Sequence, residues 1–477
     1  MDESHNVESR NVDPSGVESR NDTPSGIDPV ATDGTSPADG PHTVGALLQR
    51  WWTTPIIRVL VVVAVVVVIV AVAVGLFRGG DDGPTGESSS DAVPPTAGIA
   101  DTDSTLPPPE PSGPIPVDMW TPYWTLADHV GDPGRLATQL GEVREASPFW
   151  FAAPNTAADS DADVIVDRYA NADHAAAFIA AVSDSDAALV PSILDLLPAG
   201  TMAGILADDE LRAAHIAAIV RFADAYSVDG IDIDYEQFAF ADNRSTWPTT
   251  ATNWVQFLTE LDAALDADGR TVSVSIPAVY DPAVTGGDRG YWVYEHGTIA
   301  GIVDQVRIMA YDYSTSSPGP IAPLDWVRVA AGGVMSQVPP EYRNRVVLGI
   351  PAYGYNWVVS TAGTCDADAP ARTSVNAATI EDLIERRGGV AAYDPLTAEW
   401  VYEYTLAVGG DDGVDEVTCL QTRRVHWVDA EGVAARVNVA REFGFGGVAL
   451  WAHGYDDDEV WRALVDTASA PLNASSE

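Results

Sequence analysis

The chain has 477 residues, of which 46% are hydrophobic, and its 14 Trp and 16 Tyr exclude a chain that is disordered throughout. The formal net charge is −45, and all 25 basic residues are arginine. We therefore expect no nucleic-acid partner, because binding nucleic acid requires clustered cations that neutralise phosphates.

The N-terminal part of the chain predicts three segments. Residues 1–50 are polar and acidic and contain the letters VESRN twice, which indicates a disordered tail. Residues 56–77 include the uncharged run Val59–Phe77, which as a helix spans roughly 28 Å and so predicts a single transmembrane helix. Residues 79–116 are rich in Gly, Ser and Pro and predict a linker.

The position of this apolar run decides between an anchor and a cleaved signal peptide. The apolar part of a signal peptide starts near the N-terminus, whereas this one follows a long polar tail. A buried core helix is the third alternative, but the flanking sequence offers nothing to pack against. We therefore expect a single-pass protein of the cell membrane, held by residues 56–77, with the folded domain extracellular.

Residues 117–468 alternate short apolar runs with amphipathic stretches, a pattern typical of βα units and a parallel sheet. The runs are Asp118–Trp124, Pro148–Ala152, Ala188–Leu194, Gly230–Tyr235, Val272–Pro277, Gln305–Ala310, Val346–Pro351 and Gly447–Trp451. Eight strands with crossovers predict an α/β fold, a (β/α)8 TIM barrel. The remaining residues, 469–477, are expected to be disordered.

The last two runs are separated by more chain than one helix requires. This spacing predicts a small α+β insertion between strands 7 and 8, over about 356–430. The insertion would hold both cysteines, Cys365 and Cys419. A single disulfide is plausible if the domain lies outside the membrane, and two buried, unpaired thiols are the alternative.

The fourth run carries a row of carboxylates. Asp229–Glu236 reads DGIDIDYE, and side chains two apart in a strand share a face, so Asp232, Asp234 and Glu236 would point into the barrel. Like charges at close range raise the pKa of at least one member, and such rows survive mainly where chemistry uses them. The carboxyl end of a barrel strand is also where barrel enzymes place catalytic groups.

The octet DGIDIDYE resembles the DxxDxDxE signature of family-18 glycoside hydrolases. Other stretches follow in the family's order: MAYD at Met309–Asp312, GIPAYGY at Gly349–Tyr355, and Trp451 at the end of the eighth run. The long insertion is similar to the family's small subdomain. Within the family, PFWFAAP at Pro148–Pro154 and WAHGYD at Trp451–Asp456 resemble bacterial cell-wall and spore-cortex hydrolases more than secreted chitin degraders.

The resemblance implies a role for each catalytic residue. Glu236 would protonate the glycosidic oxygen, and the substrate's own acetamido oxygen would attack the anomeric carbon. Asp234 would orient the acetamido group, with Asp232 sharing a proton behind it. Tyr311 would hydrogen-bond the acetamido oxygen, and Trp451 would form the hydrophobic floor under the reacting sugar.

Further substrate-binding residues are expected in the same stretches, namely Met309, Asp312 and Tyr123. Tyr123 and its neighbour Trp124 could stack on sugars or could simply pack in the protein.

The third run departs from the family pattern. The family often carries an SxGG-like turn where this sequence has Ser192–Asp195. The serine could still hydrogen-bond the inner aspartates, but the missing glycines alter that end of the groove and leave the substrate open. The choice between stacking and packing also stays open for Trp357 and Trp427.

By this resemblance the chain is a retaining glycoside hydrolase that cleaves a β-linked N-acetylglucosamine-containing glycan by substrate-assisted catalysis, without metal or cofactor. Peptidoglycan is the favoured substrate, and chitin oligosaccharides are the alternative. A catalytically silent, lectin-like barrel at the cell surface is a second hypothesis, and a barrel that only scaffolds a partner is a third. We expect a monomer.

Overall fold

The computed structural model describes residues 113–153, 166–167, 170–365, 371–408 and 419–471. The chain divides into two units, 1–89 and 90–477, and every described residue belongs to the second. The predicted tail (1–50) and transmembrane helix (56–77) lie outside the described residues, as do most of the linker (79–116) and residues 472–477.

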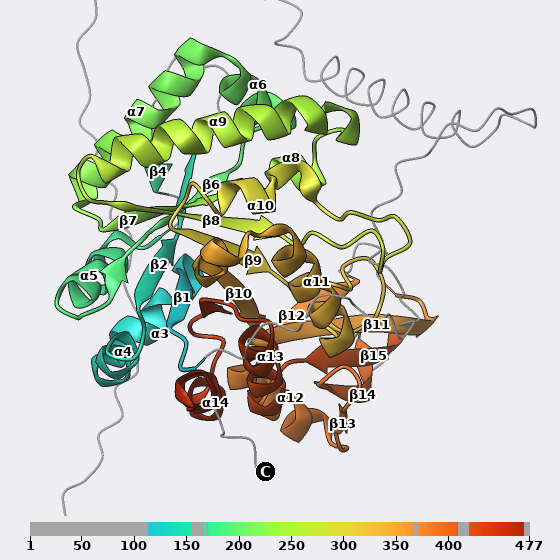
Figure 1. Ribbon diagram of the computed structural model, residues 1–477. Coiled ribbons are helices and arrows are strands. Elements are labelled where there is room, and N and C mark those ends of the chain that lie inside the picture. Colours follow the sequence, from blue (N-terminus) through green and yellow to red (C-terminus); the bar gives the residue numbers. More distant parts are fainter. Residues whose placement is uncertain (1–112, 154–165, 168–169, 366–370, 409–418, 472–477) are drawn as a thin grey trace, which may run out of the picture. The chain divides into compact units, whose positions relative to one another are not determined.

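The eight predicted runs all form strands of one sheet (Figure 1). They are β1 (Val117–Pro122), β2 (Glu145–Phe149) with β3 (Phe151–Ala153), β5 (Ala188–Leu189) with β6 (Ser192–Asp195), β7 (Gly230–Asp234), β8 (Thr271–Pro277), β9 (Gln305–Met309), β10 (Val346–Pro351) and β16 (Gly447–Trp451). Each pairs in parallel with the next, and β16 pairs with β1 as well as with β10. The predicted TIM-like sheet is therefore confirmed, with β4 (Val166–Asp167) added antiparallel beside β3.

Helices connect these strands and lie around the sheet (Figure 1). They are α3 (Leu126–Gly131), α4 (Pro133–Leu140), α5 (Ala172–Ser183), α6 (Thr201–Ala207), α7 (Asp209–Tyr226), α8 (Gln237–Phe240), α9 (Trp247–Asp266), α10 (His296–Ile299), α11 (Leu324–Gln337), α13 (Ala430–Glu442) and α14 (Asp458–Ser469). In α9, Trp254, Leu258, Leu261 and Leu265 recur at spacings of three and four and are all fully buried. This apolar stripe packs the helix against the core.

An antiparallel sheet is inserted between β10 and β16, as predicted. Its strands are β11 (Tyr353–Gly363), β12 (Arg372–Asn376), β13 (Ala392–Asp394), β14 (Glu399–Val408) and β15 (Cys419–Trp427), in the order β12-β11-β15-β14-β13, with α12 (Ala377–Arg387) after β12. Cys365 and Cys419 form a disulfide, so the alternative of two unpaired thiols is wrong. Trp357 and Trp427 are buried in this region, which decides for packing over sugar stacking.

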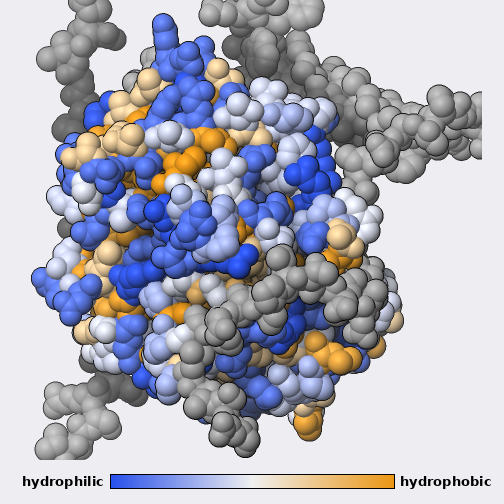
Figure 2. All heavy atoms as spheres, in the orientation of Figure 1, coloured by the Kyte–Doolittle hydropathy of each residue, from blue (hydrophilic) through white to orange (hydrophobic). Residues whose placement is uncertain are grey.

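The predicted location in the cell membrane, with a single span and an extracellular catalytic domain, needs correction. Within the described ranges, no helix is both long enough and apolar enough to cross a bilayer. The longest, α9, carries three carboxylates, and α7 begins with Asp209 and Glu210. Polar and charged residues also dominate the face of the molecule shown in Figure 2. We withdraw the predicted location.

Candidate active site

The predicted site residues lie at or just beyond the carboxyl ends of the parallel strands. Asp234 ends β7, Met309 ends β9 and Trp451 ends β16, while Glu236 lies two residues after β7 and Tyr123 directly follows β1. Because the strands run parallel, these ends lie on one side of the sheet, which is where barrel enzymes bind their substrates.

Asp232 is fully buried and accepts hydrogen bonds from three other strands. Its donors are Trp120 of β1 at 3.2 Å, Ser192 of β6 at 2.6 Å, and Ser273 and Ser275 of β8 at 2.9–3.0 Å. Arg307 of β9 lies 3.5 Å from its Oδ2 atom. The hydrogen bond expected of Ser192 is confirmed.

Asp234 and Glu236 lie in a less polar setting. Burial raises the pKa of Asp234 well above its ordinary value, and the neighbouring carboxylates Glu236 and Asp232 add to the shift. One oxygen of Asp234, Oδ1, is buried, and no described residue forms a hydrogen bond with it. Burial, with a contribution from Asp312, raises the pKa of Glu236 to about 7. A carboxyl group that keeps its proton near neutral pH is suited to act as a general acid.

The backbone that carries Glu236 is fixed by buried side chains. The hydroxyl of Tyr294 donates to the carbonyl oxygen of Tyr235 at 2.7 Å, and the Tyr235 hydroxyl bonds Nε2 of His215 at 2.6 Å. On the other side, Nε1 of Trp247 donates to the carbonyl of Phe238 at 2.7 Å. These contacts hold both flanks of Glu236 and limit its freedom to turn away from the site.

Tyr311 and Asp312 face the carboxylates from β9. Burial raises the pKa of Tyr311 well above its ordinary value, and the charges of Asp234, Glu236 and Asp312 add to the shift. Asp312 has a φ of 58°, which aspartate tolerates, and its Oδ1 accepts hydrogen bonds from Tyr353 and Tyr355 at 2.6 and 2.7 Å. Tyr311 therefore keeps its hydroxyl proton and is a neutral donor within electrostatic range of Asp234 and Glu236.

A glycine on β10 makes room for Tyr311. A Cβ atom at Gly349 would lie 2.8 Å from the carbonyl oxygen of Ile308 and 3.0 Å from Cε1 of Tyr311. Neither distance is compatible with a side chain, so the GIPAYGY stretch supplies the space that the Tyr311 ring occupies.

Aromatic rings gather around Trp451. Its ring lies 4.7 Å from Phe149 (centroid to centroid), 6.1 Å from Trp120 and 6.5 Å from Trp124. Trp451 is partly exposed, and Trp124 is 47% exposed, so both have ring surface for a ligand. Tyr123 packs edge-on against Trp124.

The structure therefore brings together most of the predicted residues. Electrostatic interactions link Asp232, Asp234, Glu236, Tyr311 and Asp312, and Trp120 connects the group to Trp451. Met309 and Tyr123 lie at the same side of the sheet, at the ends of β9 and β1, partly buried.

Sequence reasoning missed the residues beneath this group, namely Trp120, Ser273, Ser275 and Arg307. A signal was present, because polar residues alternate with apolar ones in TVSVSIP and QVRIM, and the period of two places them on one face. The interior of this barrel is therefore polar along β1, β8 and β9 as well as along β7, where the sequence predicted inward-facing carboxylates.

The chemistry available at this site follows from its parts. The protonated Glu236 can donate a proton, Asp234 beside it can hold or share one, and Tyr311 can donate a hydrogen bond to an oxygen. The partly exposed indole of Trp451 offers an apolar surface for the face of a sugar ring.

Comparison with known proteins agrees with these parts. The sequence profile described as "Glycosyl hydrolases family 18" matches residues 201–456, more than half of the chain. An "Uncharacterized glycosylase YvbX" of Bacillus subtilis (strain 168) is 24% identical over 249 residues, which cover 52% of this chain and 63% of the relative. The "Cortical fragment-lytic enzyme" of the same organism is 24% identical over 267 residues, which cover 55% of each chain.

These matches span only about half to three fifths of the curated relatives' own lengths. Among solved structures, a chitinase from Chromobacterium violaceum ATCC 12472 is similar, with a TM-score of 0.56 and 21% identity over 74% of this chain and 98% of its own. At that identity the likeness is one of fold alone.

Proposed function

The chain belongs to glycosyl hydrolase family 18 and is a glycoside hydrolase, and from this premise we propose that it cleaves β-linked N-acetylglucosamine-containing glycans with retention, peptidoglycan being the favoured substrate. The observation that carries the proposal is the pairing of Glu236, whose pKa is raised to about 7, with the buried Asp234 at the end of β7.

In the proposed reaction the proton of Glu236 passes to the glycosidic oxygen as the bond to the anomeric carbon breaks. The acetamido oxygen of the same sugar forms the new bond to that carbon, so no second enzyme carboxylate attacks. Asp234 holds the acetamido N–H and stabilises the positive charge that develops on the group. Water then opens the intermediate, and Glu236 takes a proton back.

The remaining residues bind and orient the sugar. Tyr311 donates to the acetamido oxygen, which fixes its approach to the anomeric carbon. Trp451 forms the floor under the reacting sugar, and Met309, Asp312 and Tyr123 line the site around it. No metal, cofactor or second protomer has a role in this scheme.

Peptidoglycan is favoured over chitin because of the stretches PFWFAAP and WAHGYD and because one relative is named for lysis of cortical fragments. The named chitinase, in contrast, supports the fold and not the substrate. Chitin oligosaccharides contain the same reacting sugar and are therefore the alternative substrate.

The test is the release of reducing ends from purified peptidoglycan and from chitin oligosaccharides by the full chain, beside Glu236→Gln. We expect release from peptidoglycan to fall roughly 10²–10⁴-fold in the variant, the range that removing a general acid gives. Glycan binding without release by either form would contradict the proposal and favour the lectin-like barrel.

A further inference from the structure

Arg372 lies on the face of the inserted sheet that is turned toward the active-site carboxylates. Its guanidinium carbon lies over the ring of Tyr355 on β11, 4.0 Å from the ring centroid, and 5.4 Å from the centroid of Trp357. The hydroxyl of Tyr355 donates to Oδ1 of Asp312 at 2.7 Å, and Asp312 in turn acts electrostatically on Glu236. Two side chains therefore separate Arg372 from the proposed catalytic acid.

The guanidinium of Arg372 has no acceptor among the described residues. None of them accepts a hydrogen bond from it or forms an ion pair with it. Its Nη1 atom is buried, although the side chain as a whole is partly exposed. All other described arginines that are buried or partly buried donate to an oxygen or pair with a carboxylate. A buried donor without an acceptor is rare in folded proteins and needs an explanation.

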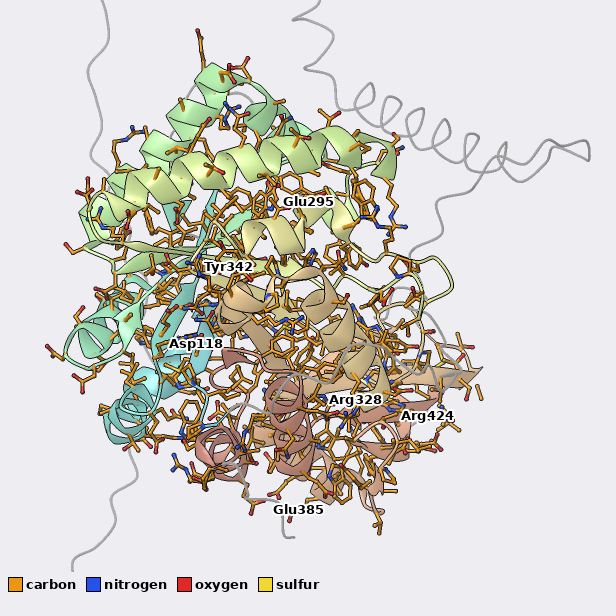
Figure 3. All side chains as sticks on the ribbon, viewed as in Figure 1. Asp118, Glu295, Arg328, Tyr342, Glu385 and Arg424 are labelled. Carbon is orange, nitrogen blue, oxygen red and sulfur yellow. A yellow bond between two sulfur atoms is a disulfide. The ribbon has the colours of Figure 1, made fainter. Side chains whose placement is uncertain are left out.

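The register of the inserted sheet explains why Arg372 lacks a carboxylate. One row of this register consists of Arg372 of β12, Trp357 of β11, Arg424 of β15 and Glu403 of β14. Residues that lie opposite one another share one face of a sheet. At one end of the row Arg424, labelled in Figure 3, pairs with Glu403 at 2.5 Å. At the other end β12 is the edge of the described sheet, so no further strand there supplies an acceptor to Arg372.

The indole of Trp357 shows the same lack of an acceptor. Its Nε1 atom is buried, and no described residue accepts a hydrogen bond from it. Trp357 is 3% exposed and packs edge-on against Tyr355, with the ring centroids 5.7 Å apart. Two neighbouring donors, one neutral and one cationic, thus have no acceptor at this edge of the sheet. Such an excess of donors favours a ligand with anionic oxygens.

Chitin and peptidoglycan differ in the group that such donors recognise. Chitin is neutral, whereas peptidoglycan carries carboxylates, either on the lactyl groups of its muramic acid residues or on the peptides attached to them. The formal net charge of the chain is −45, so its surface repels an anionic glycan, and a local cation is needed to hold a carboxylate. A guanidinium can bind a carboxylate through two parallel hydrogen bonds, and stacking on an aromatic ring leaves its edge available for them.

We propose that Arg372 binds a carboxylate of the glycan next to the reacting sugar and so selects peptidoglycan over chitin. This inference rests on the proposed function and adds the group by which the enzyme recognises its substrate. The Tyr355 ring orients the guanidinium, and the hydrogen bond from Tyr355 to Asp312 ties that ring to the active site. Arg372 orients the glycan and takes no part in proton transfer.

The test measures kcat/KM of the full chain on soluble peptidoglycan strands and on the same strands with every carboxyl group converted to an amide. Arg372→Gln should lower the ratio of kcat/KM for native strands to that for amidated strands roughly 10–100-fold, because a hydrogen-bonded charge pair is lost. The loss should appear in KM and should shrink at high salt, since Arg372 is partly exposed. Arg372→Lys keeps the charge without the two parallel N–H groups and should give an intermediate ratio.

Arg424→Gln is the matched control. It removes a guanidinium from the same row of the sheet, but one whose charge Glu403 already neutralises, so its ratio should stay within about twofold of the wild type. Equal losses on native and amidated strands in Arg372→Gln, or the same change of ratio in Arg424→Gln, overturn the proposal. If Arg372→Gln does not fold, the ratio measured for Arg372→Lys decides.

Two preparations of native strands distinguish the sources of the carboxylate. Removing the stem peptides with an amidase frees the lactyl carboxylates, whereas strands with intact stem peptides carry their carboxylates on the peptides. A loss in Arg372→Gln on the peptide-free strands identifies the lactyl group, and a loss confined to the intact strands identifies the peptide. A loss on neither preparation overturns the proposal.

Binding separates this proposal from the proposed function. Calorimetry compares native with amidated strands, using Glu236→Gln and the double variant that also carries Arg372→Gln. Tighter binding of native strands by Glu236→Gln, abolished in the double variant, supports the role of Arg372, and equal binding of both strands by Glu236→Gln overturns it. A wild type that cleaves no glycan would refute the proposed function, while the binding result would still decide the role of Arg372.

Discussion

Two buried arginine–glutamate pairs lie in different parts of the molecule. Arg307 and Glu145 lie inside the barrel, 2.6 Å apart, and Arg436 of α13 pairs with Glu399 of β14 at 3.2 Å, where the barrel meets the inserted sheet. All four side chains are at most 8% exposed. The two pairs have similar burial and chemistry, so any difference between them comes from their surroundings.

The groups that contact Arg436 and Glu399 are mostly backbone, and Asp429 and Asp394 also act on the pair electrostatically. Its guanidinium donates to the carbonyl oxygens of Ala398 and Gly432 at 3.0 and 2.7 Å. Glu399 accepts from the backbone N–H groups of Ile321 and Ala322 at 2.9 and 2.7 Å. This pair joins segments that are far apart in the sequence, and its role is structural.

The pKa shifts of the two arginines point in opposite directions. Burial lowers the pKa of Arg436, and Glu399 offsets only part of the effect. Three carboxylates surround Arg307 and raise its pKa despite burial. Burial is the largest influence on Arg436, whereas the carboxylates around Arg307 outweigh burial, and such an excess of negative charge raises the pKa of nearby carboxyl groups.

Breaking the structural pair should have the largest effect on stability. Glu399→Ala leaves Arg436 as an unpaired buried charge, which should lower the free energy of unfolding by about 3–5 kcal/mol. Urea unfolding measures this loss, and the pH profile of the remaining activity should match the wild type. A shifted profile would show that the two regions are coupled.

Removing a hydrogen-bond donor to Asp232 should lower stability less than breaking the Arg436–Glu399 pair. Ser275 donates to both oxygens of Asp232, at 3.0 and 2.9 Å, and hydrogen bonds to charged groups are worth about 1.5–3 kcal/mol. Ser275→Ala should therefore lower stability by that amount and reduce kcat. Ser183→Ala, which removes a solvent-exposed hydrogen bond to the carbonyl oxygen of Ile179 within α5, is the control and should leave kcat unchanged.

Glu236, the proposed catalytic acid, should lower stability at high pH. The pKa of Glu236 is raised from 4.5 to about 7, so the folded state binds the proton more tightly, and stability falls as pH rises from 4.5 to 7. Glu236→Gln should be more stable than the wild type at pH 8, by on the order of 2 kcal/mol. Thermal unfolding at pH 4 should show no such gain, and a gain at both pH values would contradict the ionisation argument.

The smallest effect is expected for an exposed pair of the same type. Arg328 of α11, labelled in Figure 3, lies 2.5 Å from Glu442, and both side chains are more than 40% exposed. Glu442→Gln should lower stability by less than about 1 kcal/mol, because solvent screens the interaction. A loss of stability as large as that of Glu399→Ala would show that burial does not explain the difference between the exposed and the buried pair.

The family and the barrel could be predicted from local sequence features. The apolar runs and their spacing placed all eight strands, since strand formation and burial depend on composition and on a period of two. The octet DGIDIDYE identified Asp232, Asp234 and Glu236 because three acidic residues on one strand face are rarely tolerated without a function. The long gap before the last strand likewise predicted the insertion.

The partners of those carboxylates could not be predicted locally. Trp120, Ser192, Ser275 and Arg307 come from four strands, separated from Asp232 by 40 to 112 positions, and only the closing of the sheet brings them to its oxygens. The pairing of Cys365 with Cys419 and the burial of Trp357 also depended on the folded sheet.

The sequence by itself therefore determined the fold and the row of acidic residues, because these follow from composition and periodicity along the chain, and the resemblance of DGIDIDYE and the later motifs indicated the family. The tertiary structure alone decided which carboxyl group faces a cation and which has no donor. Protonation depends on distances and burial in space, and neither quantity is set by neighbours in the sequence.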